Sequence, residues 1–126
     1  MYLGDKQFGL LEKVIGASVI RHKVIANNIA NVNTPGYKRL DISFENELKA
    51  ALKGNSNTDI TAVKPKVVVA KNTEKTSLRK DGNNVNIEEE VSDLVKNALS
   101  YNVLVQLMSK KFAALKTAIG GGTQGG

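Results

Sequence analysis

The sequence predicts a mainly α-helical protein in which two long terminal helices form an antiparallel, coiled-coil-like pair around a small irregular lobe that contains β-structure. Apolar residues recur at steps of three and four along both ends of the chain, as they do on one face of an α-helix. Between the two ends this periodicity is lost, and turn-forming and β-branched residues replace it. We therefore divide the chain into an N-terminal helix (1–33), a lobe (34–86), a C-terminal helix (87–119) and a flexible glycine-rich tail (120–126).

The N-terminal helix is predicted from an apolar stripe that starts near the beginning of the chain. Its members are Phe8, Leu11, Ile15, Ile25, Ile29 and Val32. Ser18 and His22 fall on the same stripe and weaken its middle. A single histidine on such a stripe is more often a packed polar residue than a metal ligand, and we interpret His22 in this way. A helix of about 30 residues is about 45 Å long, more than a compact domain of this size needs.

The end of this helix is unusually rich in asparagine and is followed by a helix-breaking tetrapeptide. The residues concerned are Asn27, Asn28, Asn31, Asn33, Thr34, Pro35, Gly36 and Tyr37. Pro35 disfavours the helical conformation for the residue before it, and Gly36 suits the position of a type II turn that requires a positive φ. Two interpretations of the asparagines stay open at this point: a polar cap on an ordinary helix, or a surface that hydrogen-bonds something ordered.

The lobe is predicted to begin with a short helix and to continue as strands and turns. The helix would be capped by Ser43, and one face of it would carry Phe44, Leu48, Ala51 and Leu52. The β-branched run 66–70 predicts a strand, and residues 54–59 read as a polar loop. Asp81 and Gly82 are typical of a tight turn, which would close a hairpin between residues 76–80 and 83–86.

The C-terminal helix has a capping signal and a more regular apolar seam. Asn86 is the expected cap, and the glutamates at 88–90 place negative charge at the positive end of the helix dipole. From Ile87 onward the apolar positions alternate strictly between steps of four and three, which is a coiled-coil pattern. They are Val91, Leu94, Ala98, Tyr101, Val105, Met108, Phe112, Leu115 and Ile119. The glycines from 120 onward are expected to end the helix.

Two lone helices cannot cover both seams, so we expect neighbouring subunits to complete the hydrophobic core. Each apolar Å² left in water forgoes about 25 cal/mol of stabilisation. The ends of an isolated monomer should therefore be poorly ordered, and the seam positions are our candidate assembly residues.

Composition argues against several other classes of function. The chain of 126 residues has no cysteine and one histidine, and it has no phosphate-binding glycine motif. We expect no enzyme, metal site or cofactor. We also expect no membrane span and no cleaved secretory signal. Eight basic against three acidic residues give segment 49–81 a net charge of +5. Without interleaved aromatic residues this charge favours a solvated lobe over a nucleic-acid site.

The stretch ANNIANVNTPGYK (26–38) resembles the N-terminal signature of the bacterial flagellar axial proteins. The stretches LRKDGNNVN (78–86) and LSYNVLVQLMSKKFAALKTAI (99–119) resemble, within that group, the proximal members of the flagellar basal-body rod proteins. The resemblance implies a structural subunit of the rod, the shaft that transmits motor torque, located in the periplasmic space.

The same resemblance implies partners. They would be further copies of this chain, other rod proteins, the adaptor at the rod base and the gate of the flagellar type III export apparatus. Phe44 and Leu48 match the spacing of a gate-recognition motif of early flagellar substrates, although an ordinary i, i+4 pair on a helix has the same spacing. A coiled-coil export chaperone in the cytoplasm is the competing class, because it would share the seams without needing the turn at 34–37.

Overall fold

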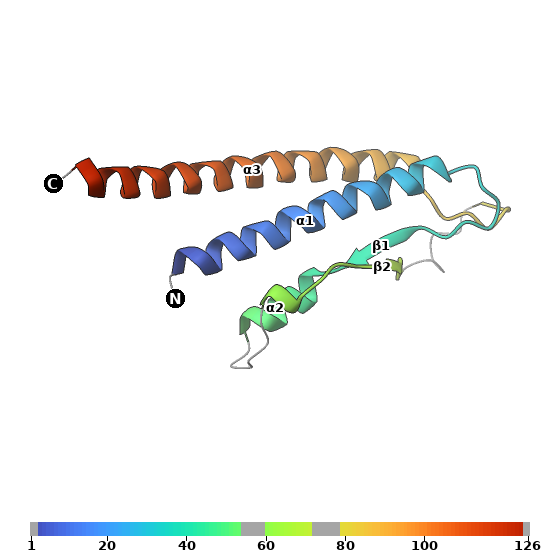
Figure 1. Ribbon diagram of the computed structural model, residues 1–126. Coiled ribbons are helices and arrows are strands. Elements are labelled where there is room, and N and C mark those ends of the chain that lie inside the picture. The colour runs from blue at the N-terminus through green and yellow to red at the C-terminus, as the bar shows by residue number, and fades with distance from the viewer. Residues whose placement is uncertain (1–2, 54–59, 72–78, 125–126) are drawn as a thin grey trace.

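The computed structural model describes residues 3–53, 60–71 and 79–124. Two long helices, α1 (Leu3–Ala30) and α3 (Ile87–Gln124), run antiparallel, and α1 lies between α3 and the lobe (Figure 1). The lobe consists of β1 (Leu40–Ser43), α2 (Glu45–Lys53), the 3₁₀ turn η1 (Ile60–Ala62) and β2 (Lys66–Val69). The predicted fold class, two long terminal helices packed on each other with a small β-containing lobe between them in the chain, is confirmed.

Helix α1 ends three residues earlier than we predicted, because its last turn tightens. The N–H of Val32 bonds to the carbonyl of Ile29 at 3.2 Å, three residues back instead of four. The predicted type II turn follows, since the N–H of Tyr37 donates to the carbonyl of Thr34 at 3.2 Å and Gly36 has a φ of 72°. The chain therefore reverses sharply after α1 and returns along it as β1.

The hydrophobic core lies between α1 and the lobe. Its members are Ala17, Val24, Ile42, Phe44 and Val63, against which Val14, Ile20, Leu40, Leu48 and Ala51 pack. None of these residues belongs to α3. The core therefore joins α1 to the lobe and leaves α3 to be held by other contacts.

Helix α2 forms where we predicted it, with two corrections. The N–H of Leu48 bonds to the carbonyl of Phe44 at 2.9 Å, so the helix is capped at Phe44, one residue after the predicted Ser43. Leu52 was predicted on the apolar face but is 53% exposed, because that face is completed by Leu48 and Ala51.

Strand β2 matches its prediction, but its partner does not. It pairs antiparallel with β1, from Leu40 opposite Val69 to Ser43 opposite Lys66. The predicted hairpin is wrong in its described part, because residues 79–86 contain no strand, and positions 76–78 lie outside the described residues. The reason is that Asn83 and Asn84 use their side chains, not a strand ladder, to bond the rest of the chain.

Helix α3 begins as predicted and ends later. The Oδ1 atom of Asn86 accepts the N–H groups of Glu88 at 3.0 Å and of Glu89 at 3.4 Å, which confirms the cap. The helix continues to Gln124, so the predicted end at residue 119 is wrong, and the glycines that follow are part of the helix. Glycine costs about 1 kcal/mol relative to alanine in a helix, but extending an existing helix avoids the cost of nucleation.

Candidate assembly surface

A buried polar junction joins the end of α1 to the start of α3. Asn28 and Glu90 are both fully buried, and Nδ2 of Asn28 donates to Oε2 of Glu90 at 3.3 Å and to the carbonyl of Leu40 at 2.8 Å. Oδ1 of Asn28 accepts the N–H of Leu40 at 2.9 Å and the hydroxyl of Tyr37 at 2.8 Å. One amide thus ties α1 to the turn, to β1 and to α3.

Arg39 compensates the buried carboxylate of Glu90. Its Nε donates to Oε1 of Glu90, and its Nη2 lies 3.5 Å from Oδ2 of Asp93. Burial by itself lowers the pKa of Arg39, but the hydrogen bond and charge of Glu90 outweigh it, so the pKa is raised. The guanidinium therefore stays charged. The backbone N–H of Arg39 donates to Oδ1 of Asn84 at 2.6 Å.

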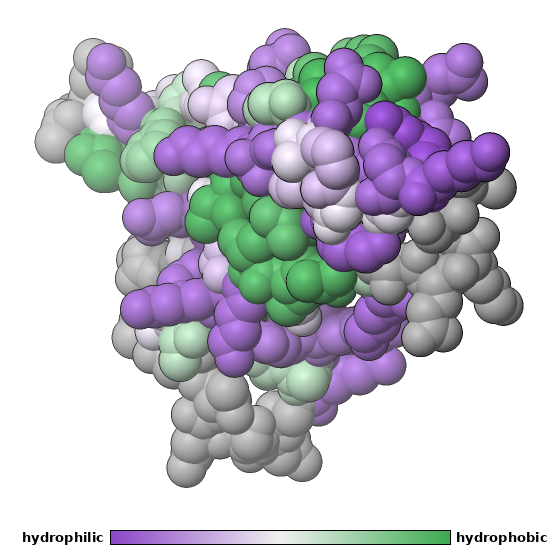
Figure 2. Space-filling view, turned by 90° about the vertical axis from the view of Figure 1, so that its right-hand side faces the viewer, coloured by the Kyte–Doolittle hydropathy of each residue, from purple (hydrophilic) through white to green (hydrophobic). Residues whose placement is uncertain are grey.

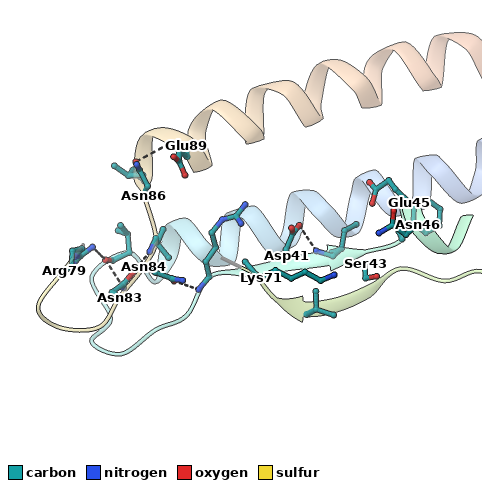
Figure 3. Close-up of a pocket in the computed structure, with 18 residues that line it drawn as sticks. Asp41, Ser43, Glu45, Asn46, Lys71, Arg79, Asn83, Asn84, Asn86 and Glu89 are labelled. Atoms are coloured by element: carbon teal, nitrogen blue, oxygen red, sulfur yellow. Dashed lines mark hydrogen bonds between the residues drawn. The ribbon is translucent and has the colours of Figure 1, made fainter. Parts of the chain in front are cut away.

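Asn83 caps the C-terminal end of α1 from a distant part of the chain. Its Nδ2 lies within hydrogen-bond distance of three carbonyls, those of Asn31 (2.8 Å), Val32 (3.0 Å) and Thr34 (2.8 Å). Its Oδ1 accepts the N–H of Val85 at 2.8 Å. Figure 3 shows Asn83 and Asn84 side by side in the loop that leads to α3. Each of these carbonyls also accepts a bond from another donor (the N–H of Thr34, Nη1 of Arg79 and the N–H of Tyr37, in that order), so Asn83 adds bonds that hold its loop against the chain just after α1.

The asparagine cluster on α1 serves this junction. Nδ2 of Asn31 donates to the carbonyl of Asn27 at 2.8 Å, and Nδ2 of Asn27 donates to the Tyr37 hydroxyl at 2.9 Å. Burial, which favours the neutral phenol, raises the pKa of Tyr37 although the bond from Asn27 lowers it. We had left open whether these asparagines form a polar helix cap or a surface that hydrogen-bonds something ordered. Their bonds within the chain support the helix cap.

Sequence reasoning missed several residues of this junction. They are Arg39, Asn83, Asn84, Glu90 and Asn97. Glu90 in particular is not only a charge on the helix dipole, as we had interpreted it, but a buried partner of α1 and β1. A signal was present: Glu90 and Asn97 lie seven residues apart, so they fall on one row of the predicted helix, next to its apolar seam.

The row of α3 that faces α1 is largely polar. Nδ2 of Asn97, which is 7% exposed, donates to the carbonyl of Ser18 at 2.9 Å. Further along, Nζ of Lys111 bonds to Oε1 of Gln7, and the rings of Phe8 and Phe112 lie 4.7 Å apart. The two helices are thus placed in register mainly by hydrogen bonds.

The predicted assembly seam is largely covered on α1 and only partly covered on α3. On α1, Leu11 and Ile25 are buried, and Phe8, Ile15, Ile29 and Val32 are half-buried. On α3, Leu94 and Met108 are half-buried, and the exposed seam positions are Val91, Ala98, Tyr101, Val105, Phe112, Leu115 and Ile119. Seen from the junction end, apolar side chains gather at the level of α3 and again near the centre, each group bordered by hydrophilic ones (Figure 2).

The incomplete cover of the α3 seam has a physical cause. The polar row that contains Glu90 and Asn97 is turned toward α1, and the coiled-coil seam lies on the flank of that row. His22 is exposed, so our interpretation of it as a packed polar residue of the α1 stripe is wrong. It lines a small hollow of about 310 Å³ together with Val19, Ala98 and Tyr101.

The two candidate export-gate residues are part of the core. Phe44 is 2% exposed, and Leu48 is half-buried beside it. Phe44 therefore contributes almost nothing to the surface of the described part of the chain.

Two further classes of site find no support in the described residues. Within 3–53, 60–71 and 79–124, no group of three histidine or acidic side chains is placed to hold a metal ion. None of the helices in the described part combines the length and the hydropathy that a membrane span requires.

Comparison with known proteins gives one consistent family. A family model described as "Flagella basal body rod protein" matches residues 17–38, which include the end of α1 and the turn. The flagellar basal body rod protein FlgB of Bacillus subtilis (strain 168) is 34% identical over 119 residues, covering 89% of this chain and 92% of the relative. The FlgB protein of Aquifex aeolicus (strain VF5) is 35% identical over 116 residues, covering 89% and 91%. That of Escherichia coli (strain K12) is 28% identical over 132 residues, covering 94% and 96%.

Proposed function

Because this chain belongs to the flagellar basal body rod protein family, we propose that it is a structural subunit that enters the rod by packing its terminal helices against those of its neighbours. The observation that supports this proposal is the exposed seam of α3. Val91, Val105 and Leu115 are 45%, 40% and 45% exposed, although their spacing is that of a buried coiled-coil seam. Copies of this chain, other rod proteins and the adaptor at the rod base would supply the missing cover.

In the rod, these helices would form the inner layer of a shaft that transmits torque and surrounds the export channel. The layer would be located in the periplasmic space, which the subunit would reach through the flagellar type III apparatus without a cleaved signal. Val91 and Val105 already have more than half of their surface covered, so completing the burial of either one contributes roughly 1 kcal/mol. Repeated along α3, such contacts would give the shaft its stiffness.

Recognition by the export gate would use Phe44 and Leu48 before the chain folds. Phe44 is buried by α1 and β1 in the folded monomer, so a gate could contact it only in an unfolded or partly folded chain. The same two side chains would then serve first in export and later in the core.

Fractionation of detergent-washed basal bodies tests the proposal. A strain that lacks the natural subunit is complemented with a labelled copy of this chain. We expect the label to remain with the basal bodies and motility to return. A label that stays in the cytoplasmic fraction, with hooks and motility unaffected by loss of the protein, would instead identify an export chaperone.

A further inference from the structure

We infer that, in the assembled rod, the face of α3 opposite α1 packs on α1 of the next copy of this chain. The α3 face consists of Val95, Leu99 and Val103, which we call the outer row. The matching face of α1 carries small residues and two charges, and we call it the flank row: Glu12, Gly16, Val19, Lys23, Ala26 and Ala30. The inference rests on the proposed packing of terminal helices in the rod, and it specifies which faces meet.

The outer row points away from the rest of the chain. Leu99 lies nine residues from Glu90, about two and a half turns, so the two side chains are on opposite faces of α3. Because Glu90 is hydrogen-bonded to Asn28 of α1, Leu99 faces away from α1. Val95 and Val103, four residues to either side of Leu99, extend the same row.

The outer row is more exposed than the seam of α3. Val95, Leu99 and Val103 are 54%, 61% and 64% exposed, compared with 45% for Val91 of the seam. From residue 97 to residue 109 the sequence of α3 contains no charge. A helix at the edge of a protein normally has a polar or charged outer face, so an apolar face in this position indicates that a partner covers it.

The flank row of α1 is suited to receive these large side chains. All six of its residues are exposed, and its uncharged members are only glycine, alanine and valine. A Cβ added to Gly16 meets nothing within 4 Å, so the packing within one copy does not require a glycine there, although glycine destabilises a helix interior relative to alanine. A surface of small residues lets a second helix approach closely, and large side chains such as Leu99 fill the space beside them.

The outer row and the flank row are two different surfaces, so each copy can use one row toward each of two neighbours. A contact between different surfaces does not stop at a dimer but continues around a ring or along a helix. A subunit of a shaft requires a contact of this kind. The contact does not require that free subunits have ordered terminal helices, because these helices can become ordered as each copy joins.

Charges along both rows favour one direction of packing. Within one copy α3 is antiparallel to α1 (Figure 1), so copies that point the same way along a shaft bring α3 of one copy antiparallel to α1 of the next. Glu88 and Lys110 are exposed at the two ends of the outer row. In this orientation Glu12 of the next copy lies toward Lys110, and Lys23 lies toward Glu88. A parallel contact would bring like charges together.

Cross-linking within purified basal bodies tests the contact, because the natural chain has no cysteine. With Glu12 beside Lys110, Gly16 of one copy lies within about one helical turn of Val103 of the next. A chain with both Gly16→Cys and Val103→Cys, treated with a short bifunctional thiol reagent, should give a ladder of cross-linked multimers of this chain. Either substitution alone should give no ladder, since each contact would then contain a single thiol. A double variant that is retained in basal bodies but gives no ladder would overturn the inference.

Filling the space beside Gly16 tests the inference without cysteines. Gly16→Leu should be lost from washed basal bodies, whereas Ala50→Leu, at an exposed position of α2, is the matched control and should be retained. Lys110→Glu should lower the retained label roughly threefold, and Glu12→Lys in the same chain should restore it. Equal retention of Gly16→Leu and Ala50→Leu would overturn the inference. Failure of the natural chain itself to enter basal bodies would instead overturn the proposed function.

Discussion

Glu90 on α3 accepts a hydrogen bond from Asn28 on α1 at 3.3 Å, and neither side chain is exposed to solvent. The chain thus joins its two terminal helices through a buried carboxylate, which is costly to desolvate unless it is paired. Arg39 provides the pairing charge from the segment that follows the turn. The stability of the junction should therefore depend on all three side chains together.

Replacing Arg39 by methionine should destabilise the monomer strongly. The substitution keeps much of the side-chain volume but leaves the Glu90 carboxylate uncompensated, which we expect to cost about 3 kcal/mol. Urea denaturation measures the loss. Adding Glu90→Gln should recover part of it, because a neutral amide is cheaper to bury. The control is Arg21→Met, which removes an exposed ion pair with Glu45 and should cost less than about 1 kcal/mol. Equal losses for the two arginine variants would contradict the role given to Arg39.

Replacing Asn83 should loosen the end of α1. Asn83→Ala removes the Nδ2 donor that bridges the carbonyls of Asn31, Val32 and Thr34, each of which keeps one other donor, and we expect a loss of about 1 kcal/mol. Asn83→Asp should be worse, because a carboxylate would face the same three carbonyl oxygens. Asn33→Ala, at an exposed position in the neighbouring turn, is the matched control and should stay within about 0.5 kcal/mol. If Asn83→Asp were tolerated as well as Asn33→Ala, the capping assignment would be wrong.

The same glycine-to-alanine change should have opposite signs at two positions. Gly36 has a φ of 72°, so alanine there should cost about 1–2 kcal/mol. Gly16 lies within α1, and a Cβ added to it meets nothing within 4 Å. Gly16→Ala should therefore stabilise the monomer by about 0.8 kcal/mol. Thermal melts of both variants check the pair, and a stabilising Gly36→Ala would show that the turn does not need a positive φ.

Alkaline pH should weaken the junction through Tyr37. Its pKa is raised above the ordinary value of 10.0, chiefly because burial favours the neutral phenol, so the folded state retains the proton longer than the unfolded state. The stabilisation is fully present below the unfolded pKa and is lost as pH rises through the folded pKa. Denaturation at several pH values above 9 should show a steeper fall for the natural chain than for Tyr37→Phe. Parallel curves would contradict this.

The elements that depend on local signals could be predicted from the sequence. Asn86 capped α3 as its position indicated, and Pro35 with Gly36 formed the expected turn. Strand β2 was visible in its β-branched residues. Its partner was not, because β1 carries little strand signal of its own and pairs across more than twenty residues of chain.

The rotation of α3 was beyond sequence analysis for a different reason. An apolar repeat identifies the seam of a helix but not which neighbour covers it. Here the rotation is set by two long-range hydrogen bonds, from Asn28 to Glu90 and from Asn97 to Ser18. These bonds turn a polar row toward α1; the seven-residue spacing of Glu90 and Asn97 marks that row in the sequence but does not identify their partners on α1.

Val105→Asp should separate folding from assembly. Val105 is 40% exposed in the monomer, so its replacement should change the free energy of unfolding by less than about 1 kcal/mol. In the rod the same position would be buried against a neighbouring helix, where an unpaired carboxylate is far more costly than a valine. We therefore expect this variant to be exported and then lost from washed basal bodies, with loss of motility. Leu94 is a poorer test position, because it is half-buried within the monomer itself.

Val67→Asp is the matched control for this experiment. Val67 is 52% exposed on β2, so the chemical change and the effect on monomer stability are comparable, but the site is distant from α3 in the sequence and in the fold. We expect Val67→Asp to be retained in basal bodies at close to the level of the natural chain. Retention of Val105→Asp together with loss of Val67→Asp would place the assembly surface on the lobe, and the exposed seam of α3 would then require another explanation.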